Sequence, residues 1–302
     1  MFLKLLSEWF SKQSIDKNIL IRSRGKNTSD SIINQTDVVR LKTEKTGVKN
    51  TGYSKYKNIL SDVSPDEIKK WEENIYKFFN GTFSLDYIQK LYYTNLPGYN
   101  IYIQHIGVDP DFQELGIELI LKFRDKENAG ELFRVIEKGL GDTLNADHRY
   151  FYLEPNHRNK GLSIDINKNT ENGYKDLGVS SIHLYAGDIV GGYAWALQGY
   201  NFLSILDRDE IRHLLETNIK ENYSIYNIET YQIDNLIDLL YGLENSWEFA
   251  LWNPLNEEYG NHLGKKLMLG TRWKAIKYLN DLDLGYQIGM SYYEYKKSNS
   301  SV

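Results

Sequence analysis

A basic, glycine-containing turn between residues 153 and 163 has the residue types and spacing needed to bind a phosphate group. Arg158, Gly161 and Ser163 form the pattern R-x-x-G-x-S, and Pro155 stands three residues before the arginine. In such a turn, successive backbone N–H groups can point at one spot, and the positive end of a following helix adds to the attraction for an anion. The turn is therefore predicted to bind phosphate or diphosphate.

Strands and a helix must hold this turn in place. A strand at 149–153 leads into it, and a polar helix is expected from Gly161 to about Leu177. The next strand is expected at 179–186, and a helix containing VGGYAWALQGY follows it. In the first helix the apolar residues share one side, so the asparagines on the other side are expected to meet water or ligand: Asn159, Asn167, Asn169 and Asn172.

The order of these features resembles the GNAT superfamily, the acyl-CoA-dependent N-acyltransferases. The family's phosphate-binding turn is Q/R-x-x-G-x-G/A after a strand that ends in a hydrophobic-x-Pro pattern, and here it reads Leu153 to Ser163, with serine in the last position. The family enters its next strand with a run of the type LGV-x-x-I-x-L, which is similar to Leu177-Gly178-Val179 followed by Ile182-His183-Leu184. The family's next helix ends in a glycine-aromatic pair, which is similar to Gly199-Tyr200. The match covers about 50 of 302 residues.

The resemblance implies that acetyl-CoA or another acyl-CoA is the co-substrate. The strands at 149–153 and 179–186 would diverge, and the pantetheine arm of the acyl donor would lie in the gap between them. His157 would lie beside the phosphates. The residues expected to bind the acyl donor are those of the turn: Leu153, Arg158, Asn159, Lys160, Gly161, Leu162 and Ser163.

The catalytic residues are harder to assign from the pattern. In the family, a tyrosine four residues before the glycine-aromatic pair protonates the leaving thiolate, but that position here is Trp195, whose indole is no useful acid. Tyr193 is the first substitute, and Tyr185 and Tyr200 are others. His148 and Glu154, with Asp147 behind them, are the candidate bases that would deprotonate the amine. No metal motif is present in the sequence.

Two classes of function remain open. One is an N-acyltransferase that moves an acetyl or longer acyl group to an amine, and this amine could belong to a peptide or protein. The other is a catalytically inactive GNAT-like binding or structural module, which Trp195 at the acid position makes plausible. Calorimetry with acetyl-CoA and longer acyl-CoAs is expected to separate the two: absence of binding to all of them would exclude the enzyme, and binding that is lost in Arg158→Glu or Gly161→Glu would support it.

Composition limits the alternatives. The 36 basic and 41 acidic residues give a net charge of -5 and are mixed along the chain, which argues against a nucleic-acid partner. Cysteine is absent, which excludes disulfides and a cysteine-bound acyl intermediate and favours the cytoplasm. The apolar run in residues 1–12 is too short for a transmembrane segment, and it is expected to form an amphipathic helix that docks on the body or a partner, or else at a membrane surface.

The predicted fold class is α+β (mixed α/β), with a mixed, mostly antiparallel sheet flanked by helices. Residues 1–60 would hold the first helix and a polar linker, 61–205 the GNAT-like core, and 206–302 an α/β extension packed on it. Further strands are expected at 99–106, 118–124 and 131–136, and 266–270 as a strand or turn that adds to the sheet. Other helices are expected at 65–79, capped by Ser64, at 84–93, at 207–220, capped by Asp207, and at 233–243.

Overall fold

The computed structural model describes residues 63–139, 141, 143–257 and 261–299, all of which belong to one compact unit that spans 56–302. The predictions made for residues 1–60, an amphipathic helix followed by a polar linker, lie outside the described residues.

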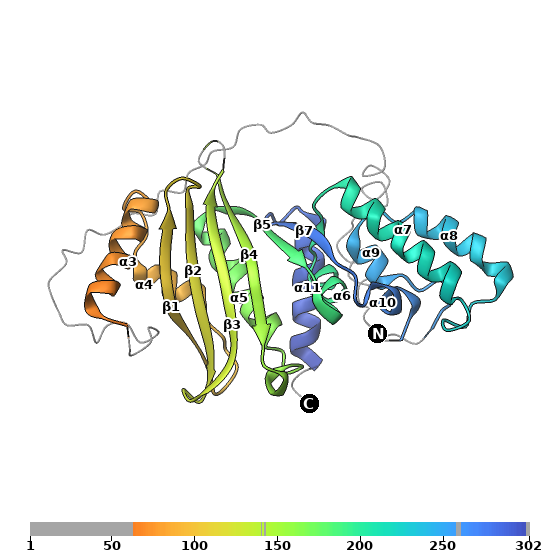
Figure 1. Cartoon of the computed structure of the whole chain (residues 1–302), viewed down its shortest axis with the longest axis horizontal. Coiled ribbons are helices and arrows are strands. Elements are labelled where there is room, and N and C mark those ends of the chain that lie inside the picture. The colour runs from red at the N-terminus through yellow and green to blue at the C-terminus, as the bar shows by residue number, and fades with distance from the viewer. Residues whose placement is uncertain (1–62, 140, 142, 258–260, 300–302) are drawn as a thin grey trace. The chain divides into compact units, whose positions relative to one another are not determined.

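A seven-stranded sheet runs through the unit in the order β1-β2-β3-β4-β5-β7-β6 (Figure 1). Neighbouring strands are antiparallel except β4 and β5, which are parallel. The predicted α+β class with a mostly antiparallel sheet is thus confirmed. The strands are β1 (Tyr99–Asp109), β2 (Glu114–Phe123), β3 (Glu127–Lys138), β4 (Leu144–Leu153), β5 (Val179–Ala186), β6 (Asn201–Phe202) and β7 (Trp273–Tyr278).

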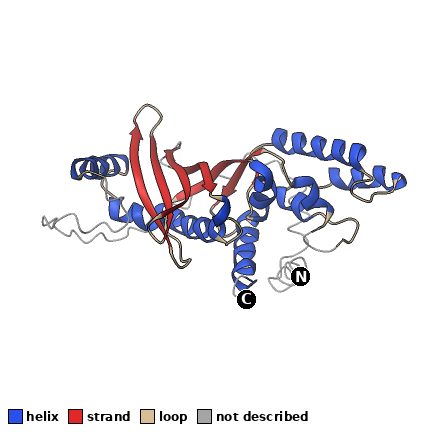
Figure 2. Ribbon diagram, turned by 60° about the horizontal axis from the view of Figure 1, so that its bottom comes forward, coloured by secondary structure: helices blue, strands red, loops and turns tan. Residues whose placement is uncertain are grey.

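Helices cover the sheet and extend beyond it (Figure 2). Helix α5 packs on β5 and α4, α11 packs on α5 and β7, and α3 packs on β1. On the C-terminal side, α7 packs on β6, β7 and α8, while α9 and α10 pack on each other and on α6. The α-helices are α3 (Pro65–Phe78), α4 (Leu85–Leu91), α5 (Leu162–Leu177), α6 (Asp188–Leu197), α7 (Ile205–Asn222), α8 (Ile233–Tyr241), α9 (Ser246–Leu251), α10 (Leu263–Met268) and α11 (Leu284–Asn299).

Local sequence signals located α3, α5 and β5 well, whereas β4 begins at Leu144, five residues before the strand that was predicted at 149–153. Ser64 caps α3 as predicted, because its side-chain oxygen accepts a hydrogen bond from the backbone N–H of Glu67 at 3.2 Å. Helix α5 ends at Gly178, whose φ of 83° is a left-handed conformation that glycine adopts without strain, and β5 has the bounds that were predicted. The apolar side of α5 is buried as expected: Leu162, Ile166, Tyr174 and Leu177.

Several predictions were wrong, some because a neighbouring residue takes the expected role and others because the deciding contacts are remote in sequence. Helix α7 begins two residues early, since Ser204 and not Asp207 is its cap. Residues 266–270 do not form a strand: they end α10 and turn toward β7. The strand that completes this part of the sheet is β7, which was not predicted. On α5, Asn167 and Asn169 are buried, because Gln198 packs against one and the segment before β1 against the other.

Candidate functional site

The sheet is split between β4 and β5. The two strands pair only from Leu144 to His148 on β4, and the last pair is His148 with Leu184. Beyond it β4 continues to Leu153, paired only with β3, while the end of β5 pairs only with β7. At about 3.3 Å per residue, the unpaired end of β4 is roughly 16 Å long.

A β-bulge in β4 explains where the split begins. His148 and Arg149 together stand opposite the single residue Arg134 of β3, so that Val135 pairs with Asp147 and Phe133 with Tyr150. A bulge bends its strand and increases the local twist. Because the bend falls at the last residue that pairs with β5, it directs the rest of β4 away from that strand.

The predicted phosphate-binding turn stands where β4 ends. Asn159 and Gly161 have positive φ angles of 60° and 78°, and Gly161 is the N-cap of α5. Within the described part of the chain, the backbone N–H groups of residues 159–164 donate no hydrogen bond, and the first helical bond of α5 is from Asp165 to Gly161. A side chain added at Gly161 would meet no atom within 4 Å. The turn therefore leaves six consecutive N–H groups unbonded among the described residues, at the positive end of a helix and with open space beside Gly161.

Two side chains hold the turn against the sheet. His157 is buried, and its ring nitrogens contact the hydroxyl of Tyr99 at 2.9 Å and a carboxylate oxygen of Glu127 at 3.0 Å. Through these contacts the buried ring anchors the turn to β1 and β3. Arg158 is exposed, and its Nε donates to the carbonyl of Leu153 at 2.8 Å. Lys160 is also exposed, whereas Leu162 is buried and offers only its backbone to the open space.

His148, a predicted base, lies at the closed end of the split and is only 5% exposed. Its ring is tilted against that of Tyr174 of α5 at 5.8 Å. Neither ring nitrogen has a hydrogen-bond partner within the described residues. Burial, followed by the positive charges of Arg134 and Lys277, holds the pKa of His148 well below 6.5. The imidazole is therefore neutral at pH 7.

This shift predicts how stability depends on pH. Below pH 6.5 the unfolded chain binds a proton at His148 and the folded chain does not, so stability falls as the pH falls, by up to roughly 1.4 kcal/mol per pH unit. In chemical denaturation between pH 7.5 and 5, His148→Phe should reduce this slope. An unaltered slope in His148→Phe would contradict the assignment.

The other predicted base, Glu154, lies at the open end of the split. Its backbone N–H donates to the carbonyl of Ala129 at 3.0 Å, and its carboxylate accepts from the hydroxyl of Tyr152 at 3.3 Å. The rings of Tyr150 and Tyr152 stack at 6.5 Å. Burial, with the charges of Glu131 and Glu154 among the further causes, raises the pKa of Tyr150. Glu154 is six positions after His148, about 20 Å along the extended chain, so the two do not act on one atom.

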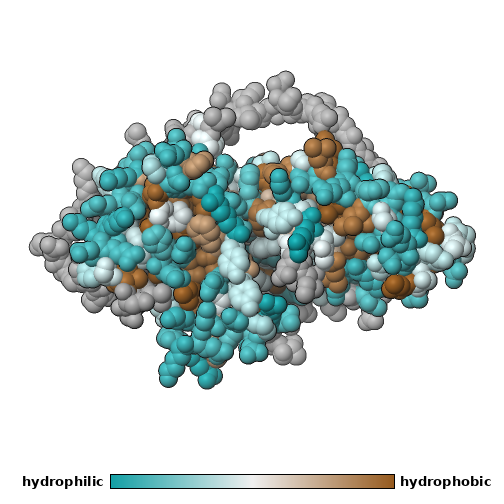
Figure 3. Space-filling model, viewed as in Figure 1, coloured by the Kyte–Doolittle hydropathy of each residue, from teal (hydrophilic) through white to brown (hydrophobic). Residues whose placement is uncertain are grey.

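This tyrosine pair was not singled out in the sequence, although the alternation Tyr-x-Tyr at the end of a strand is a signal for it. The pair stands on the side of β4 away from α5. In the view of Figures 1 and 3, where α5 lies behind the strands, hydrophilic and apolar side chains mingle on this face. On β5, the 62% exposed Tyr185 lies beyond the last pair with β4.

The remaining acid candidates lie elsewhere. The ring of Tyr193 is 6.3 Å from that of His262, next to α10, and Lys265 lies 6.0 Å from its centroid. Tyr200 is fully buried, and burial, followed by the Glu171 charge, raises its pKa well above 10. The nearby Gly192 is needed for packing, because a Cβ there would lie 2.2 Å from the hydroxyl of Thr271. The structure does not bring Tyr193, His148 and Glu154 together.

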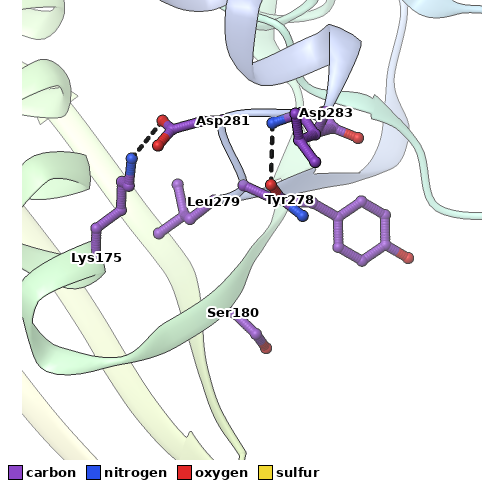
Figure 4. Close-up of a pocket in the computed structure, with 8 residues that line it drawn as sticks. Lys175, Ser180, Tyr278, Leu279, Asp281 and Asp283 are labelled. Atoms are coloured by element: carbon purple, nitrogen blue, oxygen red, sulfur yellow. Dashed lines mark hydrogen bonds and ion pairs between the residues drawn. The ribbon is translucent and has the colours of Figure 1, made fainter. Parts of the chain in front are cut away.

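A pocket of about 720 Å³ opens at the other end of β5 (Figure 4). It is bounded by the start of β5, the end of β7 and the segment before α11, and Lys175 reaches across it to Asp281 at 2.5 Å. The turn follows the end of β4, whereas this pocket adjoins the beginning of the parallel strand β5. The pocket therefore does not belong to the split.

Two further findings come from the residues that the structure describes. They contain no group of three or more histidine, aspartate or glutamate side chains placed to hold a metal ion. None of their helices combines the length and the apolar character required to cross a membrane. A scan against protein-family models finds no match to this chain, and a search of curated proteins finds none either.

Proposed function

We propose that this chain is an acyl-CoA-dependent N-acyltransferase of the GNAT type, which binds the diphosphate of acetyl-CoA or another acyl-CoA at the turn. The observation that carries the proposal is the combination of a sheet split beyond His148 and Leu184 with six unbonded N–H groups at the end of the same strand. Either feature alone is common. Together they would place an anion site at one end of a stretch where the edge of β4 toward β5 has no strand partner, and an extended chain such as pantetheine would lie along that edge.

The charges and the backbone fit such a donor. The exposed Arg158 and Lys160 flank the turn and add positive charge to that of the helix end. Between Arg149 and Leu153 the side of β4 toward β5 carries backbone groups with no ladder partner. These groups can bind the amides of a pantetheine arm much as a strand would. The thioester would then lie toward the closed end of the gap.

Transfer would proceed by direct attack of an amine on the thioester. A base takes a proton from the amine, the new C–N bond forms, and a tetrahedral oxyanion develops that backbone N–H groups can stabilise. Collapse breaks the C–S bond and releases CoA as a thiolate, which takes a proton. Tyr185 lies one residue beyond the last pair of β5 with β4 and is an exposed acid near the closed end, whereas Glu154 lies about 20 Å along the chain from that end and would not reach the thioester there.

Calorimetry with CoA and acetyl-CoA tests the donor site. Wild-type protein is expected to bind both, and Gly161→Glu is expected to weaken binding at least tenfold, because the new carboxylate enters the open space before the N–H groups and repels the diphosphate. No binding of CoA or any acyl-CoA to the wild type would refute the proposal.

Gly178→Glu is the matched control. Gly178 also has a positive φ and nothing within 4 Å of an added Cβ, so the backbone strain and the added charge are alike. It lies at the far end of α5, about 24 Å from Gly161 at 1.5 Å per residue. The affinity of the Gly178→Glu variant for CoA is therefore expected to stay within about twofold of the wild-type value.

The alternative is a GNAT-like module that binds without catalysis. Trp195 at the expected acid position and the orientation of Tyr193 toward α10 favour it. Mass spectrometry of polyamines, free lysine and lysine-rich peptides after incubation with acetyl-CoA separates the two. Acetylation of an acceptor by the wild type, but not by Gly161→Glu, supports the proposal that the protein is an enzyme. Binding of CoA without transfer to any of these acceptors supports the module.

A further inference from the structure

Arg134 of β3 carries a buried positive charge that has no counter-ion within the described residues. Its side chain is 1% exposed. Nη1 donates to the carbonyl oxygens of Phe133 at 3.2 Å and Tyr150 at 2.5 Å, but Nη2 has no acceptor among the described residues. The other fully buried charges, Lys277 and Glu171, pair with each other at 2.7 Å. Since a guanidinium remains protonated, one positive charge is left over.

The adjacent buried imidazole is also unsatisfied. His148 belongs to the pair of β4 residues that stand opposite Arg134 at the bulge, and neither of its nitrogens has a partner in the described part of the chain. A neutral imidazole offers one donor and one acceptor. Each buried polar group without a partner costs about 1–3 kcal/mol, so a cluster of them points to a missing ligand.

The position of this cluster indicates which ligand. His148 forms the last pair between β4 and β5, so the cluster lies where the unpaired stretch of β4 begins. The turn stands at the other end, about 16 Å away along β4. A molecule anchored at the turn and extended through the gap would bring its inner end to Arg134 and His148.

We propose that Arg134 and His148 bind a carboxylate at the far end of the acyl group, and that the preferred donor is a CoA thioester of a dicarboxylic acid. This inference rests on the proposed function, which supplies the CoA site. A carboxylate matches the cluster, because it accepts hydrogen bonds from both Nη2 of Arg134 and an imidazole N–H and neutralises the buried guanidinium. A neutral acyl chain would leave the charge and both donors unpaired.

Succinyl-CoA and butyryl-CoA test the inference, because their acyl chains differ only in a terminal carboxylate in place of a methyl group. Wild-type protein is expected to bind succinyl-CoA at least tenfold more tightly than butyryl-CoA in calorimetry. Equal affinities would overturn the inference and leave the proposed function intact. If neither thioester nor CoA itself binds, the proposed function fails.

Variants at the bulge show whether Arg134 causes the preference. Arg134→Met is expected to bring the ratio of the two affinities to within about threefold of one, and His148→Leu to reduce it. Arg149→Met is the control, because this neighbouring arginine is already paired with Glu114 and Asp147 at 2.8 and 3.0 Å, and the ratio should stay above tenfold. A preference unchanged in Arg134→Met would overturn the assignment. Should that variant not fold, His148→Leu and the wild-type ratio decide.

A carboxylate on the acceptor is the other possible source of the same chemistry. In that case succinyl-CoA and butyryl-CoA bind the wild type equally, and free succinate binds the complex with CoA more tightly in the wild type than in His148→Leu. That result would overturn the assignment of the carboxylate to the donor.

Discussion

Lys277→Met is expected to lower the free energy of unfolding by about 3–5 kcal/mol, because it leaves a buried carboxylate without its counter-ion. Lys277 and Glu171 are both fully buried, with Nζ 2.7 Å from the carboxylate and 2.8 Å from the carbonyl oxygen of Gln198. Removal of the lysine leaves a carboxylate in the core with only hydroxyl partners: Tyr293 donates to it at 2.7 Å, and Tyr200 lies at 3.4 Å. Urea denaturation measures the loss.

A second substitution should restore most of the lost stability. With Lys277→Met and Glu171→Gln combined, no unpaired charge remains and the amide oxygen can still accept from Tyr293, so we expect less than half the loss of the single variant. Lys220→Met is the surface control, because Lys220 is half exposed and water screens its pair with Glu216 at 2.6 Å, so that the pair contributes little to stability. A loss in Lys277→Met no larger than in Lys220→Met would contradict the prediction.

Elements that depend on interactions between residues close in sequence were predicted, and elements that depend on contacts between distant residues were not. The turn, α5 and β5 depend on local signals, such as a glycine with positive φ at each end of α5, and these elements were located almost to the residue. Strand β7 was missed, because its two lysines, Lys274 and Lys277, give it the sequence pattern of a solvent-exposed segment. Only the carboxylate on α5, 106 residues away in sequence, makes a lysine acceptable there.

The residues of the candidate site also fall into two groups, those predicted from local spacing and those whose positions depend on contacts remote in sequence. The residues of the turn were predicted because their spacing alone defines the backbone path. The buried Arg134 was not predicted, since it interrupts the apolar run of β3 and its partners depend on a bulge in the next strand. Tyr193 was chosen by counting along the chain, but α6 turns it toward α10, an element that had been expected to be a strand or turn. Side-chain direction on a helix depends on which elements pack around it.

Gly199→Ala is expected to lower the free energy of unfolding by about 4 kcal/mol or more. Gly199 has a φ of 83°, and an added Cβ would lie 1.8 Å from the carbonyl oxygen of Gly285 and 3.0 Å from the backbone nitrogen of Gly289, both on α11. Because these neighbours are backbone atoms, the helix itself must move, and it carries Tyr293 of the Lys277–Glu171 cluster.

Gly270→Ala distinguishes the cost of a left-handed backbone at alanine from the cost of a clash between the new Cβ and neighbouring atoms. Gly270 has nearly the same φ, 81°, but nothing lies within 4 Å of an added Cβ, so only the left-handed conformation of alanine is unfavourable, at about 1–2 kcal/mol. Thermal and urea unfolding of the two variants should therefore differ by at least about 2 kcal/mol. Equal stability of Gly199→Ala and Gly270→Ala would mean that α11 does not approach the end of α6 this closely. The packing inferred around Lys277 would then be wrong as well, since α11 supplies one wall of that cluster.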